Sequence, residues 1–150
     1  MNIQGEYTFH GSREEVWNIF RDPDLLITAL PGTKNLKKIS ENEYEGELQV
    51  HIGPILGSFS GKLTISNESY LENLTLAVDG NGKIGFVKGS GDVKFNSISE
   101  NLTAIRYDGV IQIGGRVASV GQRLFDTVSK NMIKGGLDKL DTALQDRRKG

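Results

Sequence analysis

The start of the chain combines one strand-like segment with two helix signals. Residues 3–9 alternate between two faces, which is typical of a half-buried strand. Ser12-Arg-Glu-Glu15 follows as a capping box, in which the serine hydroxyl and the glutamate carboxylate each accept one early backbone N–H group of a helix. Pro23 ends this short helix, because proline disfavours helical geometry in the preceding residue. It also suits the first turn of a second short helix, which Pro31-Gly32 would end.

From Gly32 onward the apolar positions recur at every second residue, the period of a strand. Turns are expected at residues 40–43, at Gly53-Pro54, at residues 67–73 and, as a hairpin, at Asp79-Gly80. The strands expected between these turns span residues 36–39, 44–52, 58–65, 74–78, 84–95 (as one strand or a pair) and 103–113. Short connections between such strands predict an antiparallel meander, which Gly114-Gly115 would end.

The last part of the chain returns to helical spacing, from Arg116 to about Asp146. A helix of this length would span roughly 45 Å, which is longer than is needed to cap one end of a small domain. It must therefore lie along a whole sheet. Gly121 and Gly135-Gly136 interrupt it, and a helix glycine costs about 1 kcal/mol relative to alanine. We therefore expect a close approach to the sheet, or a kink, at these glycines.

The order of the elements predicts an α+β fold in one domain of residues 1–150. We expect a curved antiparallel sheet of about seven strands wrapped around the long C-terminal helix, with two short helices after the first strand. The 19 glycines would let the strands bend sharply. A bent sheet that grips one helix leaves a space, and large gaps are costly unless a ligand or water fills them. An internal apolar pocket is therefore the leading site hypothesis.

Composition removes several classes of site. The chain has no cysteine, which excludes a disulfide scaffold, a cysteine nucleophile and thiolate metal sites. The two histidines, His10 and His51, are expected to be solvated, so we expect no metal site and no cofactor. A net charge of −1 gives no reason to bind nucleic acid. The N-terminus lacks a secretory pattern and no apolar run reaches membrane-spanning length, so we expect a cytoplasmic protein.

Motifs for catalysis are also absent from the sequence. Gly80-Asn-Gly82-Lys-Ile-Gly85 fits the dinucleotide-binding fingerprint, but the residues that follow indicate a strand where that fingerprint needs a helix. No zinc-protease, nucleophile-elbow or calcium-loop motif occurs, so we predict no catalytic residues.

The sequence allows two interpretations for some of the aromatic and basic residues. Trp17 is either a core anchor of the first helix or an aromatic wall at the pocket mouth, and Tyr7, Tyr107 and Phe59 share this ambiguity. A tyrosine inside the pocket could offer its hydroxyl to a ligand carbonyl. Residues Lys34, Lys37 and Lys38, and the C-terminal run 147–149, are either solvated or weakly attracted to an anionic membrane or an acidic partner.

Several local sequences together resemble the G-subunit family of carbon monoxide dehydrogenase, within the Bet v 1/START-like (SRPBCC) superfamily. The resemblance covers about residues 1–144. It rests on Ser12 with Val16-Trp17, Asp22-Pro23 with Leu25-Leu26, Leu30-Pro31-Gly32, Gly53-Pro54 with Gly57, Phe59 and Gly61, Ile113-Gly114-Gly115-Arg116, and Gly121 with Arg123-Leu124. Thr33 stands where family members often carry cysteine, which removes any thiol role.

The resemblance implies a helix-grip fold that holds a small apolar ligand. It also implies a non-enzymatic accessory protein for a molybdenum hydroxylase of the carbon monoxide dehydrogenase type, which binds a lipid or quinone-like molecule and has possible transient contact with the inner face of the membrane. Two alternatives remain open. One is a cyclase- or hydrolase-type enzyme of the superfamily, and the other is a docking or assembly factor with an incidental cavity.

The expected ligand-binding residues follow from position and strand phase. A lid side, a sheet side and a helix side should enclose the pocket. The lid side consists of Trp17, Phe20, Leu30 and Pro31. The sheet side consists of Leu48, Val50, Phe59, Leu63, Leu76, Phe86, Tyr107 and Ile111. The helix side consists of Leu124, Val128 and Met132.

Overall fold

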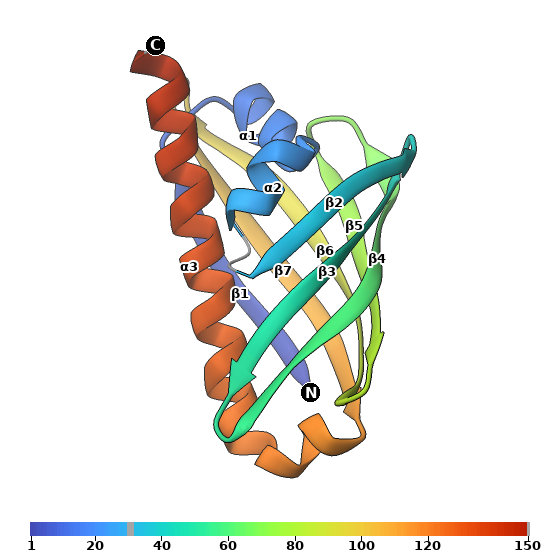
Figure 1. The fold of residues 1–150 in the computed structure, drawn as a ribbon. Coiled ribbons are helices and arrows are strands. Elements are labelled where there is room, and N and C mark those ends of the chain that lie inside the picture. Colours follow the sequence, from blue (N-terminus) through green and yellow to red (C-terminus); the bar gives the residue numbers. More distant parts are fainter. Residues whose placement is uncertain (30–31, 150) are drawn as a thin grey trace.

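The computed structural model describes residues 1–29 and 32–149. Figure 1 shows a curved sheet, two short helices near one end of it and one long helix beside it. The elements are β1 (Asn2–Phe9), α1 (Arg13–Ile19), α2 (Pro23–Ala29), β2 (Thr33–Ser40), β3 (Glu43–Ile52), β4 (Ile55–Ser69), β5 (Asn73–Gly82), β6 (Gly85–Ser99), β7 (Leu102–Gly114), a 3₁₀ turn η1 (Arg116–Val120) and α3 (Gln122–Lys149).

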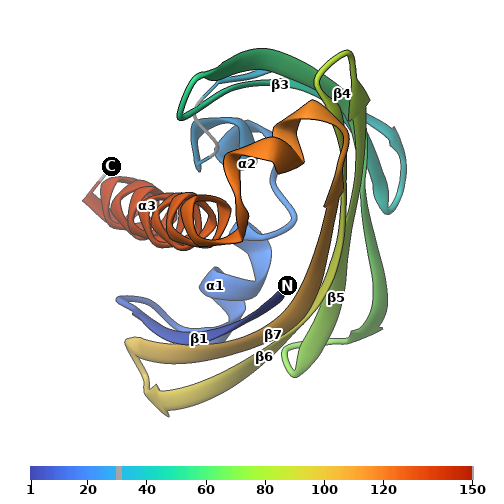
Figure 2. The same ribbon diagram turned by 90° about the horizontal axis from the view of Figure 1, so that it is seen from below.

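The strands form one seven-stranded antiparallel sheet in the order β1-β7-β6-β5-β4-β3-β2. From β2 to β7 each strand pairs with its neighbour in sequence, and β1 completes the sheet by pairing with β7. The sheet curves, and α3 lies across its open side (Figure 2). The predicted fold class, a curved sheet around a long C-terminal helix with two short helices after the first strand, is confirmed.

The capping box forms as predicted. The Glu15 backbone N–H donates to Ser12 Oγ at 3.1 Å, and the Ser12 backbone N–H donates to Glu15 Oε1 at 2.9 Å. α1 ends at Ile19 and α2 begins at Pro23, so the sequence signals also locate the break between the two helices. The expected turn at Pro31-Gly32 lies partly outside the described residues.

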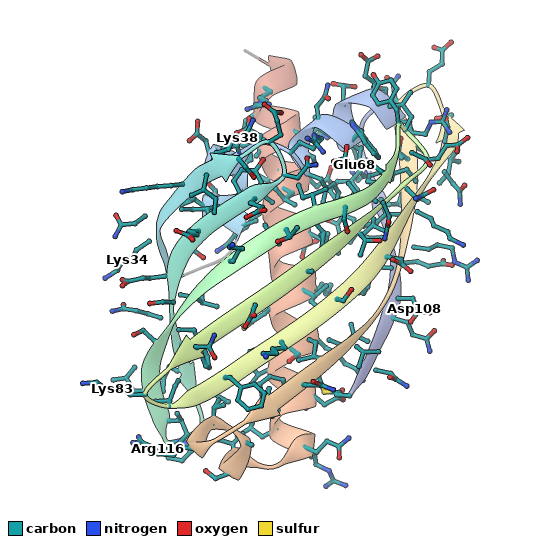
Figure 3. The ribbon with its side chains drawn as sticks, turned by 90° about the vertical axis from the view of Figure 1, so that its right-hand side faces the viewer. Lys34, Lys38, Glu68, Lys83, Asp108 and Arg116 are labelled. Carbon is teal, nitrogen blue, oxygen red and sulfur yellow. The ribbon has the colours of Figure 1, made fainter. Side chains whose placement is uncertain are left out.

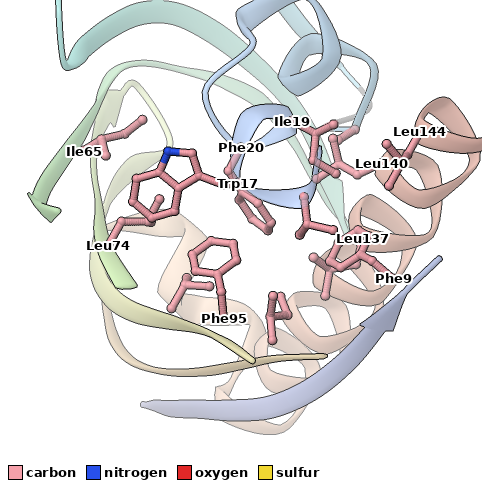
Figure 4. Packing of buried hydrophobic residues seen from close by; sticks show 14 of the residues in the cluster. Phe9, Trp17, Ile19, Phe20, Ile65, Leu74, Phe95, Leu137, Leu140 and Leu144 are labelled. Atoms are coloured by element: carbon pink, nitrogen blue, oxygen red, sulfur yellow. The ribbon is translucent and has the colours of Figure 1, made fainter. Parts of the chain in front are cut away.

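One end of the molecule is filled by an aromatic and aliphatic cluster (Figure 4). The rings pack edge to face, with centroids 5.2 Å apart for Trp17 and Phe95 and 5.6 Å apart for Phe20 and Phe95. We call this cluster the packed end. It comprises Phe9, Val16, Trp17, Ile19, Phe20, Ala29, Tyr44, Ile65, Leu74, Val93, Phe95, Ile105, Leu137, Leu140 and Leu144.

The prediction of a hairpin turn at Asp79-Gly80 is wrong. β5 continues to Gly82, the turn falls at residues 83–84, and β6 runs as one strand from there. Gly80 is glycine for a packing reason, because a Cβ at this position would come within 3.3 Å of Phe59 Cβ on the neighbouring strand. The expected loop at residues 67–73 is also shorter than predicted, since β4 extends to Ser69 through an irregularity after Ser66.

The expected helix from Arg116 to Asp146 is two elements. Residues 116–120 form η1, and α3 begins only at Gln122. Gly121 between them has φ +92°, a conformation that glycine adopts without strain, so the chain changes direction there. Gly136 makes a close approach, but to α2 rather than to the sheet as expected, since a Cβ on it would lie 3.1 Å from the Ala29 carbonyl oxygen.

Candidate functional site

A cavity of about 450 Å³ lies between the sheet and the N-terminal half of α3. Its walls come from all seven strands and α3, and Phe20 contributes beside the packed end. The exposure of Val78 shows that side chains do not fill the whole space above the inner face of the sheet. Val78 shares the inner face of β5 with Leu76, and yet 46% of it is exposed. Nearly half of an apolar side chain on the inner face of the sheet is therefore left uncovered here.

Two pairs of facing glycines create this space. Gly61 lies opposite Gly80, and Gly91 lies opposite Gly109. A Cβ on Gly61 would come within 2.7 Å of the Asp79 carbonyl oxygen. These close approaches let the strands bend, as the sequence predicts for its strand glycines. All four glycines line the cavity, so the residues that bend the sheet also leave it hollow.

Most of the predicted ligand-binding residues line this cavity. Each of the three predicted sides contributes, although only one residue of the predicted lid does so. The residues are Phe20, Leu48, Val50, Phe59, Leu63, Leu76, Tyr107, Ile111, Val128 and Met132. Two further residues of the predicted lid, Leu30 and Pro31, lie outside the described residues.

Trp17 does not line the cavity. It is 3% exposed, and its ring packs edge-on against Phe95 and, at 5.7 Å between centroids, against Tyr70. Of its two readings, the structure therefore supports the core anchor. Tyr7 is also outside the cavity, whereas Tyr107 and Phe59 lie in its wall.

The predicted positions of Phe86 and Leu124 are wrong. Phe86 lies on the outer face of β6, with the Lys88 Nζ 5.9 Å from its ring centre, and Val87 takes the inner position. Glycines at the inner positions 85, 89 and 91 hide the alternation, so the aromatic residue was assigned inward. Leu124 is 36% exposed, and its neighbour Phe125 faces the cavity because α3 begins later than expected.

Other lining residues were missed by the sequence reasoning. Phe125 lies three residues before Val128 and seven before Met132, a helical spacing that could have identified it. Ile3 lies on the predicted inner face of the first strand, and Thr33 had no recognisable signal. The missed residues that face the cavity include Ile3, Thr33, Leu36, Val87, Phe125, Ser129, Ile133 and Leu137.

Two hydroxyl groups stand out in this apolar lining. Thr33 Oγ1 is buried and has no hydrogen-bond partner in the described part of the chain. Tyr107 OH lies over β1, where a Cβ on Gly5 would come within 2.4 Å of it. A buried hydroxyl without a partner loses its hydration without compensation, so Thr33 Oγ1 is a site of unmet hydrogen-bonding capacity beside the cavity.

α3 is tied to β1 along one of its edges. The Tyr7 hydroxyl donates to Asp138 Oδ1 at 2.6 Å, and the His10 backbone N–H donates to Asp141 Oδ1 at 3.0 Å. His10 Nδ1 lies 2.8 Å from Asp141 Oδ2, so this histidine is exposed but paired. Burial and the hydrogen bond to Asp138 both raise the pKa of Tyr7 above its usual range. We call these contacts the β1 seam.

Along its other edge α3 is separated from β3 by a groove of about 660 Å³, which we call the β3 groove. The end of β3 forms one wall and residues 128–139 of α3 form the other. The lining residues are Gly32, Gln49, Val50, His51, Ile52, Leu56, Val128, Asn131, Met132, Gly135, Gly136 and Lys139. His51 is exposed, as predicted, but lies in this groove.

The predicted basic segments are opposed by acidic residues. Lys34 pairs in register with Glu47, Lys37 pairs with Glu45, and Lys38 Nζ lies 3.6 Å from Glu41 Oε2. At the C-terminus, Arg147 forms an ion pair with Asp22. Figure 3 shows Lys34 and Lys38 on the outside of the sheet. These contacts reduce the positive potential that either segment could present to an anionic surface.

The outer face of β7 is likewise solvated. Arg106 Nε lies 2.9 Å from Glu6 Oε1 of the paired strand β1, and Asp108 points outward (Figure 3). Among the described residues, no group of three or more histidine, aspartate or glutamate side chains could hold a metal ion. No helix within this part of the chain is long and apolar enough to cross a membrane.

Several solved structures have similar folds, and one of them is a START superfamily protein. A conserved protein from Geobacillus kaustophilus has a TM-score of 0.92 at 29% identity, covering 97% of this chain and 96% of that one. A START superfamily protein from Mycobacterium smegmatis has a TM-score of 0.72 at 10% identity, covering 97% of each chain. The Zhui aromatase/cyclase from Streptomyces sp. R1128 has a TM-score of 0.68 at 12% identity, covering 98% and 94%. The last two likenesses show the fold alone.

The sequence comparisons agree with this structural result. No curated protein matches the chain at a significant level. The model of the carbon monoxide dehydrogenase G-subunit family (CoxG) matches residues 5–145, which is nearly the whole chain. The resemblance drawn from the local motifs is therefore confirmed, and this START-like chain belongs to the CoxG family, the G-subunit family of carbon monoxide dehydrogenase.

Proposed function

We propose that this protein is a non-enzymatic binding protein for a small apolar ligand, a lipid or quinone-like molecule. The observation that carries the proposal is the apolar cavity of about 450 Å³ between the curved sheet and α3. A buried water needs two to four polar partners, and the cavity wall is mainly aliphatic and aromatic. An apolar molecule is therefore the better match to this space.

We further propose that the protein serves a molybdenum hydroxylase of the carbon monoxide dehydrogenase type as an accessory protein. Membership of the CoxG family supports this partner. A lipid-soluble electron acceptor would need a carrier with a dry interior to reach a soluble enzyme. The cavity and the family thus support the same role from independent observations.

The enzymatic alternative has less support. The fold is shared with a cyclase and with norcoclaurine synthase from Thalictrum flavum, but at 12% and 11% identity this concerns the fold alone. The inward-facing polar side chains of the cavity are Thr33, Tyr107 and Ser129. The side chains that most often transfer protons in enzymes are histidine and the carboxylates, and none of these three residues is one of them.

We propose that any contact with the inner face of the membrane is transient. Each basic residue near an anionic surface contributes about 1 kcal/mol, and the pairing of Lys34, Lys37 and Lys38 with acidic residues lowers this attraction. Sedimentation with vesicles of phosphatidylcholine and phosphatidylserine tests this. A bound fraction that persists at high salt would contradict the proposal.

Native mass spectrometry of the freshly purified protein tests the carrier role. We expect an excess mass of a few hundred daltons that disappears on denaturation, and an organic extract should identify it. Val128→Asp should abolish retention because Val128 lines the cavity. Leu124→Asp, one turn earlier on the same helix, lines neither the cavity nor the β3 groove and should retain the ligand. Circular dichroism confirms that both variants fold.

A pull-down with a purified molybdenum hydroxylase tests the partner. We expect the hydroxylase to be retained by the wild-type protein. Retention of the hydroxylase together with a bare protein mass in every preparation would contradict the carrier role and favour a docking factor. No retention would remove the proposed partner.

A further inference from the structure

The β3 groove and the cavity are adjacent hollows that share part of their walls. Both hollows are lined by Val50 and Ile52 of β3 and by Val128 and Met132 of α3. We call these four residues the neck, because they lie where the groove meets the interior. A ligand that passes between these four side chains would lie partly in the cavity and partly in the groove, at the surface between β3 and α3.

The two sides of the neck differ in chemistry. The cavity side is aliphatic and aromatic, whereas the groove also presents Gln49, His51, Asn131 and Lys139. Among its described lining residues the groove has a lysine and no carboxylate. This composition suits a head that accepts hydrogen bonds or carries negative charge, and it disfavours a cationic head.

Two adjacent glycines of α3 show that the groove is open space. Gly135 lines the groove, and a Cβ on it would meet no atom of residues 1–29 or 32–149 within 4 Å beyond its own helix backbone and chain neighbours. Gly136 also lines it but is close to α2, through the Ala29 carbonyl oxygen. Gly135 therefore leaves room along the groove wall at a position where the fold itself would tolerate a side chain.

Thr33 lies at the inner side of the neck. It pairs in register with Leu48, a cavity residue, while Gly32 beside it lines the groove. Val50 of the neck is two residues further along β3, which is a distance of about 7 Å on a strand. Thr33 Oγ1 is buried and has no partner among the described residues, so a ligand that passes the neck and displaces the side chains around it would offer this hydroxyl a polar atom to bind.

We propose that the ligand is amphipathic, with an apolar chain in the cavity and an oxygen-bearing head, neutral or anionic, in the β3 groove. A carbonyl, hydroxyl or carboxylate oxygen at the junction would take the hydrogen bond of Thr33, and the head would lie near Lys139. This inference rests on the proposed carrier function and adds where the ligand enters and which head it carries.

Calorimetry of the full chain with two probes of equal chain length tests the head preference. The probes are dodecanoate and dodecyltrimethylammonium, added below their micelle-forming concentrations after bound lipid has been removed. We expect dodecanoate to bind at least tenfold more tightly. Lys139→Ala should remove most of this preference, whereas Lys134→Ala, an exposed lysine of α3 outside the groove lining, should preserve it.

Two further variants test the path through the neck. Gly135→Leu should place a side chain in the groove and weaken dodecanoate binding about tenfold without lowering the melting temperature. Thr33→Val should raise the melting temperature of the ligand-free protein, because it removes an unpartnered buried hydroxyl, and should weaken dodecanoate binding. Opposite signs for stability and binding distinguish a ligand contact from a purely structural role.

These experiments distinguish failure of this inference from failure of the carrier function. Binding of both probes with equal affinity, unchanged in the Lys139, Gly135 and Thr33 variants, would overturn this inference and leave the carrier function standing. No binding of either probe, together with a bare mass in native mass spectrometry, would overturn both proposals.

Discussion

The two long edges of α3 differ in how they meet the sheet. At the β1 seam, Asp138 and Asp141 of the helix accept hydrogen bonds from Tyr7 and His10 of the first strand and its end. At the β3 groove the corresponding edge is separated from the strand, and among the described residues only the four of the neck lie between the groove and the cavity. The difference indicates that one edge fixes the helix, and under our proposal the other edge is where a ligand enters.

The two edges also use different parts of the helix. The seam lies in the C-terminal half, where Leu137, Leu140 and Leu144 pack into the packed end. The neck lies one to four turns earlier, at Val128 and Met132, where α3 spans the cavity. A helix that is anchored at one end and along one edge can keep its position while the other edge accommodates ligands of different size.

Of the substitutions that compare the two edges of α3, removal of the Asp141 side chain is expected to change the unfolding free energy most. Asp141→Ala takes away a nearly buried acceptor from the His10 backbone N–H and ring, which should cost about 2 kcal/mol of unfolding free energy. Lys139→Ala, which changes the groove edge, should stay within about 0.5 kcal/mol. Urea denaturation measures both. Equal effects would show that the seam does not anchor the helix.

Tyr7→Phe should have a smaller effect, about 1 kcal/mol, because it removes a single hydrogen bond to Asp138. The effect of this substitution on the unfolding free energy should also depend on pH. The pKa of Tyr7 is raised in the folded protein, by burial and by Asp138, so the folded state holds this proton more tightly than the unfolded state does. The contribution is therefore complete below the unfolded pKa of about 10 and is lost as the pH rises above it.

The measurement is denaturant unfolding of wild-type protein and Tyr7→Phe from neutral pH to about pH 11. The difference in unfolding free energy between the two proteins should become smaller as the pH approaches about 11. Tyr70→Phe is the matched control, because Tyr70 is 62% exposed and takes no part in the β1 seam. A constant difference for Tyr7→Phe would show that the tyrosine proton does not support the seam.

The fold was predictable because its signals are local. Alternation located the strands, and the capping box located the start of α1, since each depends on residues close in sequence. The errors occurred where glycine served distant contacts. Gly80 faces Phe59 rather than forming a turn. In β6, glycines at inner positions interrupt the alternation between Val87 and Val93, so Phe86 was assigned to the wrong face.

The cavity wall was largely predictable, whereas the groove was not. Leu48, Val50 and Val128 belong to apolar faces that one strand or helix defines by itself. Gln49, His51 and Lys139 carry the pattern of solvated positions, and they become a site only because the end of β3 and α3 lie side by side. Thr33 is also invisible in a sequence, since the lack of a partner for its hydroxyl is a property of the folded surroundings.

The smallest expected effect compares the two adjacent glycines of the groove edge. Gly135→Ala should stabilise the protein by up to about 1 kcal/mol, because alanine favours the helix and its Cβ meets open space. Gly136→Ala gains the same helix propensity, but its Cβ would lie 3.1 Å from the Ala29 carbonyl oxygen, so α2 must shift and the gain is lost. Thermal unfolding of the two variants in parallel measures the difference. If both alanines stabilise equally, α2 does not constrain this edge. If Gly135→Ala destabilises, the groove is not open space and the difference between the two edges of α3 disappears.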